Sequence, residues 1–230
     1  MAKLRLDLLL VEKGLAPSRE KAQALIMAGE VVMEGGHLLK PSSLVEEDAE
    51  VSLKKALPYV SRGGLKLEHA LRQFALKPAG IIALDVGAST GGFTDCLLQQ
   101  GAERVYALDV GYGQLALRLR RDPRGVVMEK VNAHYPFSLP EPVNITTIDV
   151  SFISLTKVLP QLLPHLTEPA WLLALVKPQF EARREQVQKG GLVRDPLVHA
   201  QVLGELACWC ISQGLRIRGL TPSPILGTKG

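Results

Sequence analysis

The sequence is poor in cysteine and in aromatic residues, and it contains no long hydrophobic run. It has three cysteines among 230 residues, Cys96, Cys208 and Cys210, and their spacing fits neither a zinc site nor an even set of disulfides. No apolar stretch is long enough to cross a membrane, and charges interrupt the apolar N-terminal stretch, which is atypical of a signal peptide. We therefore expect a reduced, cytoplasmic protein with no membrane segment and no metal site.

The composition indicates a globular protein with room for one domain and a small additional module. Hydrophobic residues make up 47% of the chain, and the sequence has no low-complexity tract. The formal net charge of +4 weakly favours a polyanionic partner. Residues 1–58 contain eight Lys and Arg against nine Asp and Glu, so the basic surplus lies in the rest of the chain.

Residues 81–93, IIALDVGASTGGF, are the stretch around which we interpret the rest of the chain. Its apolar run predicts a strand, and its glycines predict a turn that opens a helix and exposes bare backbone to a ligand. The spacing G-x-x-x-G-G does not match the dinucleotide fingerprint, and such a turn can also be purely structural. Asp85, before the turn, suits a ligand with a cationic amino group, which indicates S-adenosylmethionine (SAM). The candidate cofactor contacts here are Asp85, Gly87, Ser89, Gly91, Gly92 and Phe93.

Beyond this stretch, strand-like and helix-like segments alternate. Strands are expected at 104–110, 125–131, 144–150, 171–177 and 215–220, and helices at 94–100, 113–121, 154–166 and 196–213. This alternation predicts a doubly wound, Rossmann-like α/β fold with a parallel sheet between layers of helices. Ligands of such sheets bind at the carboxyl ends of the strands, where the sequence places Asp109, Asn132, Asp149 and Lys177.

The polar residues at these strand ends indicate transfer of a methyl group to a hydroxyl. Asp109 follows the glycine turn by roughly 20 residues, where a carboxylate can bind both ribose hydroxyls of SAM or of NAD. Asp149 and Lys177 end successive strands, and a dehydrogenase has no evident use for that pair. A hydroxyl is a poor nucleophile, so a lysine of lowered pKa can take its proton while a carboxylate holds the ammonium groups. Lys66, early in a helix predicted after S-R-G-G, is the third candidate for this catalytic group.

The first sixty residues predict a compact α+β module. Apolar spacing indicates helices at 4–14 and 19–28, followed by short strands at 31–33, 37–40 and 50–53. The elements R-L-D-x-L-L (5–10), S-R-x-x-A (18–22) and A-G-x-V-x-x-x-G (28–35) resemble the RNA-binding domain of small-subunit ribosomal protein S-four. The resemblance implies that Arg5, Arg19 and Lys21 contact RNA phosphates, which gives affinity without sequence choice. The alternative is that these residues are ordinary charges on solvated helix faces.

Motifs along the whole chain resemble the TlyA family, in which an S-four-like module is joined to a methyltransferase domain of the FtsJ type. They are S-R-G-G-x-K-L, D-V-G-A-S-T-G-G-F-T-D, A-L-D-V-G-Y-G-Q-L, D-V-S-F-I-S-L and V-K-P-Q-F-E. The resemblance implies SAM-dependent 2′-O-methylation of cytidine in ribosomal RNA, with Lys66, Asp149 and Lys177 as catalytic residues and ribosomal subunits as partners. We expect an RNA-binding domain at 1–56, a linker at 57–61 and a methyltransferase domain at 62–230, with Arg62 as a further RNA contact.

The sequence departs from the family pattern at its end. The family's catalytic set is Lys-Asp-Lys-Glu, and its glutamate lies just after the turn G-T-K-G, which here is residues 227–230. We interpret the sequence as a shortened form that lacks the last strand, which leaves the strand at 215–220 without its neighbour. Two alternatives to the active enzyme are an RNA-binding protein with an idle methyltransferase body and the membrane-lytic haemolysin that family labels suggest.

Overall fold

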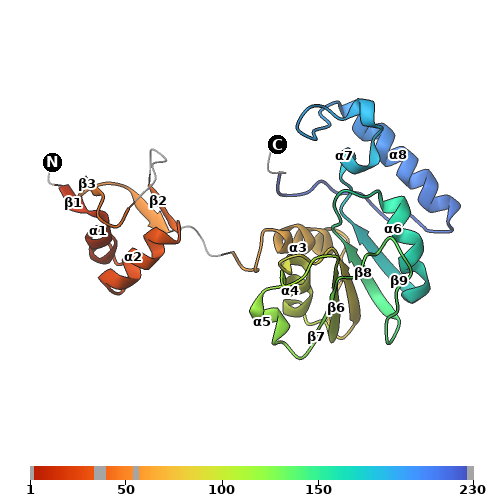
Figure 1. Ribbon diagram of the computed structural model, residues 1–230, viewed down its shortest axis with the longest axis horizontal. Coiled ribbons are helices and arrows are strands. Elements are labelled where there is room, and N and C mark those ends of the chain that lie inside the picture. The colour runs from red at the N-terminus through yellow and green to blue at the C-terminus, as the bar shows by residue number, and fades with distance from the viewer. Residues whose placement is uncertain (1–2, 34–39, 54–56, 227–230) are drawn as a thin grey trace. The chain divides into compact units, whose positions relative to one another are not determined.

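The computed structural model describes residues 3–33, 40–53 and 57–226. The chain divides into two compact units, Met1–Ala56 and Leu57–Gly230 (Figure 1). The small unit has one hydrophobic core and the large unit has two. The strand expected at 37–40 and the G-T-K-G turn fall almost wholly outside the described residues.

The small unit packs two helices against two pairs of short antiparallel strands. Its elements are β1 (Lys3–Arg5), α1 (Leu6–Glu12), α2 (Arg19–Met27), β2 (Val31–Met33), β3 (Leu44–Glu46) and β4 (Val51–Leu53). β1 pairs with β3, and β2 pairs with β4. Leu6, Leu9 and Leu10 of α1 share the core with Ala22 and Ile26 of α2, because these positions recur at helical spacing. Both predicted helices are confirmed, whereas β1 and β3 are too short for alternation to reveal them.

The large unit is a five-stranded parallel sheet with helices on both faces. The strands are β5 (Ile82–Val86), β6 (Arg104–Asp109), β7 (Gly125–Glu129), β8 (Val143–Ile148) and β9 (Leu166–Ala174), in the order β7-β6-β5-β8-β9. Helices α3 (Gly63–Gln73), α4 (Gly92–Gln99) and α5 (Leu117–Arg120) cover one face, and α6 (Leu155–Leu162) and α8 (Pro196–Ser212) cover the other (Figure 1). The single-turn helices are η1 (Leu163–His165), α7 (Pro178–Glu181) and η2 (Arg184–Gln186). The predicted doubly wound α/β fold is confirmed.

Both faces of this sheet are apolar, because successive side chains of a strand point to opposite faces and helices cover both. In β6, Val105 and Ala107 belong to the core shared with α4, while Tyr106 and Leu108 belong to the core shared with α6. The central strand β5 departs from this apolar pattern at Asp85, whose carboxylate is fully buried. A charge-bearing group in the middle of a parallel sheet needs hydrogen-bond partners, and these partners connect the strand to the candidate site.

The prediction of a strand at 215–220 is wrong. This segment is irregular, and it pairs with no strand of the described sheet. At its start, the Leu215 N–H donates a 3.0 Å hydrogen bond to the Cys210 carbonyl near the end of α8. Side chains then hold it, because Arg218 lies over the Trp171 ring and Thr221 meets His69 of α3 at 3.1 Å. An apolar segment forms a stable strand only where a neighbouring strand supplies hydrogen bonds to its backbone.

Two other boundaries differ from the prediction. The helix expected at 113–121 is reduced to α5, because Gly113 has a φ of +72° and the Ala116 N–H bonds to the Thr90 carbonyl at 3.2 Å. The strand expected to end at Lys177 ends at Ala174. Pro178, whose missing N–H is tolerated at the first helical position, then begins α7 with Lys177 as its N-cap.

Residues 57–61, expected as a linker, lie against the large unit. The Tyr59 side chain is buried, the Val60 N–H donates to Asp95 at 2.7 Å, and the Pro58 carbonyl accepts from Gln99 at 2.9 Å. The limits of the two functional domains stay a prediction. In the described ranges, none of the helices combines the length and the apolar character that crossing a membrane would require.

Candidate active site

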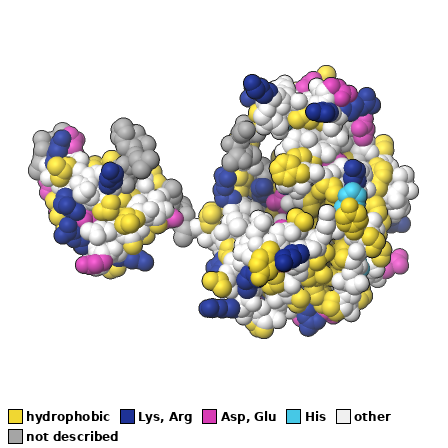
Figure 2. Space-filling model, in the orientation of Figure 1, with side chains coloured by type: hydrophobic (Ala, Val, Ile, Leu, Met, Phe, Trp, Pro, Cys, Tyr) yellow, Lys and Arg dark blue, Asp and Glu magenta, His cyan; other side chains and the backbone are white. Residues whose placement is uncertain are grey.

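A cavity of about 300 Å³ lies where the carboxyl ends of β5 and β8 meet the start of α3. Its wall is formed by Ser61, Arg62, Gly63, Lys66, Gly87, Ala88, Ser89, Thr90, Gly92, Phe93, Asp149, Ile225 and Leu226. Figure 2 shows a hollow in this unit where basic and acidic side chains meet. The wall therefore combines residues of the predicted cofactor set with residues of the predicted catalytic set.

Lys66 and Asp149 line this cavity, and Lys177, which is not part of its wall, contacts Asp149. The Lys177 Nζ lies 2.6 Å from Asp149 Oδ1, and the Lys66 Nζ lies 3.9 Å from Asp149 Oδ2. Asp149 Oδ1 is enclosed by protein. Its contact with the Lys177 ammonium is an ion pair without the geometry of a hydrogen bond. Lys177 also donates to Ser151 Oγ at 2.9 Å. All three charged side chains are 19–26% exposed, which leaves them partly shielded yet open to a substrate.

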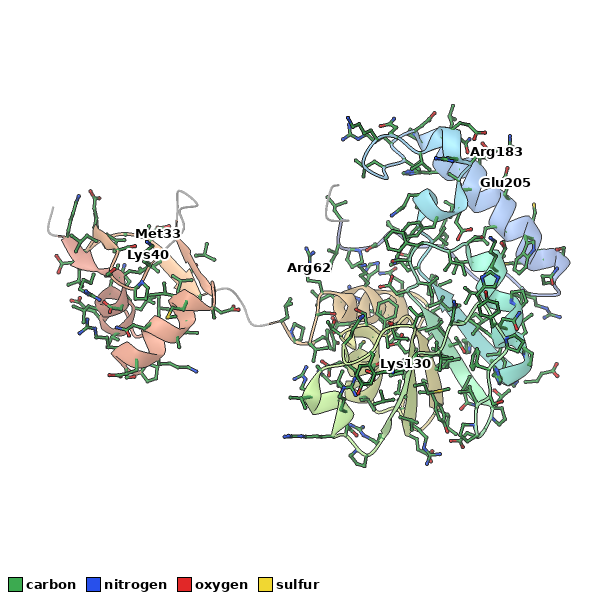
Figure 3. All side chains as sticks on the ribbon, in the orientation of Figure 1. Met33, Lys40, Arg62, Lys130, Arg183 and Glu205 are labelled. Atoms are coloured by element: carbon green, nitrogen blue, oxygen red, sulfur yellow. The ribbon has the colours of Figure 1, made fainter. Side chains whose placement is uncertain are left out.

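Lys66 reaches Asp149 because glycines let α3 begin directly against α4. A Cβ on Gly64 would come within 2.2 Å of the Tyr59 ring, and a Cβ on Gly92 would come within 2.9 Å of the Gly64 nitrogen. The two helix starts therefore pack through their backbones. Lys66 lies one turn inside α3, and Arg62 at its N-cap borders the same cavity (Figure 3).

The glycine turn after β5 lies directly on the end of β8. Gly87 has a φ of +83°, and a Cβ there would be 2.8 Å from the Asp149 carbonyl oxygen. Gly91, the N-cap of α4, has a φ of +96°, and a Cβ there would be 2.3 Å from the Leu119 side chain. Side chains are excluded at both positions, so the turn packs tightly against β8 and α5; Gly87 lines the cavity, whereas Gly91 does not.

Asp85 does not belong to the cavity wall. Its two carboxylate oxygens accept hydrogen bonds from the hydroxyls of Thr94 on α4, at 2.7 Å, and Thr147 on β8, at 3.0 Å. Burial raises the pKa of Asp85 to about 6, against the opposing effect of the two hydroxyls. The side chain thus joins the start of the helix after the glycine turn to the strand that leads to Asp149. A direct contact with a ligand, as the sequence suggested, has no support in this placement.

Asp109 and Asn132 hold neighbouring loops. Asp109 ends β6 and accepts from the N–H groups of Ser89 and Gly111, both at 2.7 Å. It thereby fixes the glycine turn from the side opposite Asp149. Asn132, which is exposed, accepts from the His134 N–H at 3.0 Å. Neither residue lines the cavity itself, and their roles toward a cofactor stay a prediction.

Glu181 is a residue of this region that the sequence analysis did not assign. Its carboxylate accepts from the Ser154 hydroxyl at 2.6 Å and from the Leu155 N–H at 2.8 Å, at the start of α6. The contact joins the loop after Asp149 to the loop after Lys177. The motifs D-V-S-F-I-S-L and V-K-P-Q-F-E contain both partners, so the motifs themselves were the available signal.

In the small unit, two predicted RNA contacts bind a buried carboxylate. Arg5 donates to both oxygens of Asp7, at 3.0 and 2.9 Å, and Arg19 donates to Oδ2 at 3.0 Å. These guanidinium groups, with the Gln23 amide at 2.9 Å, hold the pKa of Asp7 well below its usual range. Arg5 and Arg19 remain 37% and 48% exposed, and Lys21 is exposed on α2. In Figure 2 basic and acidic side chains are interspersed on this unit.

Comparison with protein families and curated proteins identifies related chains. The family model described as FtsJ-like methyltransferase matches residues 59–230, and that of the S4 domain matches residues 4–51. The chain is 51% identical over 235 residues to YqxC of Bacillus subtilis, described as a candidate rRNA methyltransferase, covering 99% of this chain and 83% of that protein. It is 44% identical over 230 residues to TlyA of Mycobacterium tuberculosis, named a 16S/23S rRNA (cytidine-2′-O)-methyltransferase, covering 98% and 86%.

A solved structure resembles the whole chain. It is described as a candidate hemolysin from Streptococcus thermophilus, with a TM-score of 0.75 and 45% sequence identity, and the match covers 99% of this chain and 84% of that one. A second curated relative, Hemolysin A of Brachyspira hyodysenteriae, is 40% identical over 230 residues, covering 99% of this chain and 96% of that protein. The related chains thus carry two different kinds of name, methyltransferase and hemolysin.

Proposed function

This chain belongs to the FtsJ-like methyltransferase family, and we propose that it methylates the 2′-hydroxyl of a cytidine ribose in ribosomal RNA with SAM as the methyl donor. The observation that carries the proposal is that Asp149, which lines the cavity with Lys66 and the glycine turn, is paired with both Lys66 and Lys177. The identity to relatives named as rRNA methyltransferases supports RNA as the substrate.

The glycine turn fits a cofactor that presses on backbone. Gly87, Ala88, Ser89 and Gly92 of the turn line the cavity, so a ligand there meets backbone and short side chains. We assign the binding of SAM to Gly87, Ser89, Gly92 and Phe93 of the wall, and to Asp109 and Asn132 on the adjoining loops. Asp85 supports this site from behind through Thr94. When bound, SAM supplies a methyl group that its positively charged sulfur makes ready for transfer.

The catalytic group prepares the hydroxyl. Asp149 holds the side-chain amino groups of Lys66 and Lys177 beside the cavity, within reach of a ribose oxygen there. One of the two lysines would act as the neutral amine and take the hydroxyl proton while the oxygen bonds to the methyl carbon. The carbon–sulfur bond would break with its electron pair left on sulfur, and Asp149 would hold the new ammonium group. The rigid placement of Lys66 and Lys177 on different elements keeps the oxygen in line with the bond that breaks.

The RNA is held by contacts away from the reacting atoms. We assign phosphate contacts to Arg5, Arg19 and Lys21 of the S4 domain and to Arg62 at the cavity. Phe152 is 90% exposed in a left-handed conformation, with φ of +62°, and its ring lies 5.1 Å from that of Phe180. We assign it to the extruded target base. Ribosomal subunits as the assembled substrate and the cytoplasm as the compartment belong to the same proposal.

Substitution of Lys177 tests this proposal. Lys177→Ala removes one ammonium group without touching the glycine turn, so methyl incorporation into ribosomal RNA should fall at least a hundredfold while SAM affinity stays within about twofold. Lys157→Ala, at an exposed lysine of α6, is the matched control and should keep full activity. A tritiated-methyl assay and isothermal titration with SAM provide the two measurements.

The same measurements separate the alternatives. Equal loss of SAM binding and methyl transfer in Lys177→Ala would make that residue structural. If the wild-type chain binds ribosomal RNA but transfers no methyl group to it, the result would favour an RNA-binding protein whose methyltransferase domain is inactive. Lysis of erythrocytes by the purified protein without SAM would favour the haemolytic activity that one relative's name describes.

A further inference from the structure

Exposed aromatic rings gather at one edge of the sheet in a chain that has few aromatic residues. Phe, Trp and Tyr make up 5% of the sequence, yet Tyr112, Tyr135 and Phe152 are 73%, 62% and 90% exposed. Each follows the carboxyl end of a strand, β6, β7 or β8 respectively. Aromatic side chains that are this exposed, at the edge of the sheet where ligands bind, indicate a binding surface.

Two of these rings form pairs with cationic or aromatic neighbours. The Lys130 Nζ lies 4.7 Å from the centre of the Tyr112 ring (Lys130 is labelled in Figure 3). The rings of His134 and Tyr135 are stacked, with centres 4.9 Å apart and planes 16° from parallel. We call these four residues the tyrosine surface. Each tyrosine thus has a fixed neighbour and a large area open to solvent.

Backbone hydrogen bonds hold the loops of the tyrosine surface in place. The Lys130 N–H donates to the Gly111 carbonyl at 3.1 Å, which ties the second loop to the first beside Tyr112. The Tyr135 N–H donates to the Asn132 carbonyl at 3.0 Å, and the Asn132 side chain accepts from the His134 N–H. Lys130 itself has a φ of +59°, an unfavourable conformation for a lysine that its surroundings must maintain. The backbone that carries the rings is therefore held in place.

We propose that the tyrosine surface binds unpaired nucleotides of the RNA substrate next to the nucleotide that is methylated. Nucleobases stack on exposed aromatic faces whatever their sequence, and a nearby ammonium group neutralises the phosphates between them. The proposal rests on the proposed function, because it names the form of RNA that reaches the site. It predicts that the RNA beside the target is single-stranded over at least two nucleotides.

Substitutions that keep or remove the ring test the proposal in the full chain. Tyr112→Ala and Tyr135→Ala should each weaken binding of a single-stranded oligoribonucleotide about tenfold, while Tyr112→Phe and Tyr135→Phe stay within about twofold of the wild type. Binding of a fully paired, blunt-ended RNA duplex of the same length should be unchanged in all four variants. Leu117→Ala, at an exposed apolar side chain of α5, controls for loss of surface area.

Lys130→Gln separates stacking from charge. It should lower the slope of log affinity against log salt for the single strand by about 0.7, whereas the tyrosine variants should leave the slope unchanged. Three results would overturn the proposal: no loss of single-strand binding in the Tyr→Ala variants, equal loss for single strand and duplex, or loss of SAM affinity by isothermal titration. The last would assign the tyrosines to the cofactor. Wild-type methylation of ribosomal RNA, measured in parallel, shows whether the proposed function stands independently of the tyrosine surface.

Discussion

Two buried carboxylates show how the partner of a side chain decides its pKa. Asp7 accepts from two guanidinium groups and an amide, which favour the charged form and lower its pKa. Asp85 accepts from two neutral hydroxyls inside the sheet, and there burial outweighs the hydrogen bonds and raises the pKa to about 6. The first carboxylate orients charged groups toward solvent, while the second joins two elements beneath the glycine turn.

The raised pKa of Asp85 predicts a specific pH dependence of stability. The folded protein binds the proton more tightly than the unfolded chain, whose pKa is near 3.8, so the free energy of unfolding should fall as the pH rises from about 4 to above 6. A shift of about two pKa units corresponds to about 3 kcal/mol over that window. In Asp85→Asn the amide can still meet Thr94 and Thr147, and this part of the slope should vanish.

Urea unfolding of both proteins at several pH values measures the difference. Glu103→Gln, at an exposed acid of the large unit, is the control and should follow the wild-type curve. If Asp85→Asn and the wild type show the same slope between pH 4 and 7, Asp85 titrates like an ordinary surface carboxylate and the assignment of its pKa is wrong.

At the scale of elements, the site depends on close contact between the glycine turn and the end of β8. Gly87→Ala places a Cβ 2.8 Å from the Asp149 carbonyl and forces alanine to a φ of +83°. Both effects displace the turn from β8, so we expect SAM affinity and methyl transfer each to fall at least tenfold. Gly204→Ala is the control, since nothing lies within 4 Å of its Cβ on α8, and it should be neutral or slightly stabilising. Unchanged SAM affinity in Gly87→Ala would contradict the assignment of SAM binding to the glycine turn.

Glu181 acts on the other side of Asp149. Its two hydrogen bonds to the start of α6 fix the loop that carries Asp149 and Ser151 against the loop that carries Lys177. Glu181→Ala should therefore lower kcat about tenfold through misplaced catalytic groups, with SAM affinity unchanged because the glycine turn is untouched. Glu181→Gln keeps an acceptor and should recover most of the rate. Glu185→Ala, at an exposed acid four residues on, is the control, and an equal effect there would remove the positioning role.

At the scale of the whole molecule, the sequence predicted the sheet well because its strands are buried on both faces. Short apolar runs that end in a polar residue revealed all five strands of the parallel sheet. The segment at 215–220 has the same apolar character, but its fate depends on whether a neighbouring strand exists, which local pattern does not contain. The short strands β1 and β3 were missed because three residues are too few to show a hydrophobic pattern.

The contact between Asp149 and Lys177 was predictable for a topological reason. Asp149 and Lys177 follow adjacent parallel strands, so their side chains must emerge at the same edge of the sheet. Lys66 comes from a helix, and only the family motif indicated that it belongs with these two residues. The burial of Asp85 and the hydrogen bonds of Glu181 depend on packing between elements distant in sequence, which residue types and spacing do not specify.

In the proposed function, the small unit contributes to how tightly the RNA substrate is held. Arg5 uses two N–H groups on Asp7 and Arg19 uses one, so each guanidinium keeps further donors for phosphate while its position is fixed. The double variant Arg5→Gln/Arg19→Gln should reduce kcat/KM for ribosomal RNA at least tenfold and lower the salt slope of RNA affinity by about 2, without changing SAM affinity. Filter binding at several salt concentrations provides the measurement.

Asp7→Asn is the variant that separates positioning from charge. It keeps both guanidinium groups but removes the carboxylate that orients them, so RNA affinity should fall while the salt slope stays near the wild-type value. Lys13→Gln, at an exposed lysine of the same unit, shows the effect of losing one unanchored charge. Circular dichroism must show a folded small unit in each variant. If the folded double variant binds RNA as tightly as the wild type, Arg5 and Arg19 serve only to satisfy Asp7, and the RNA reaches the cavity by way of other residues.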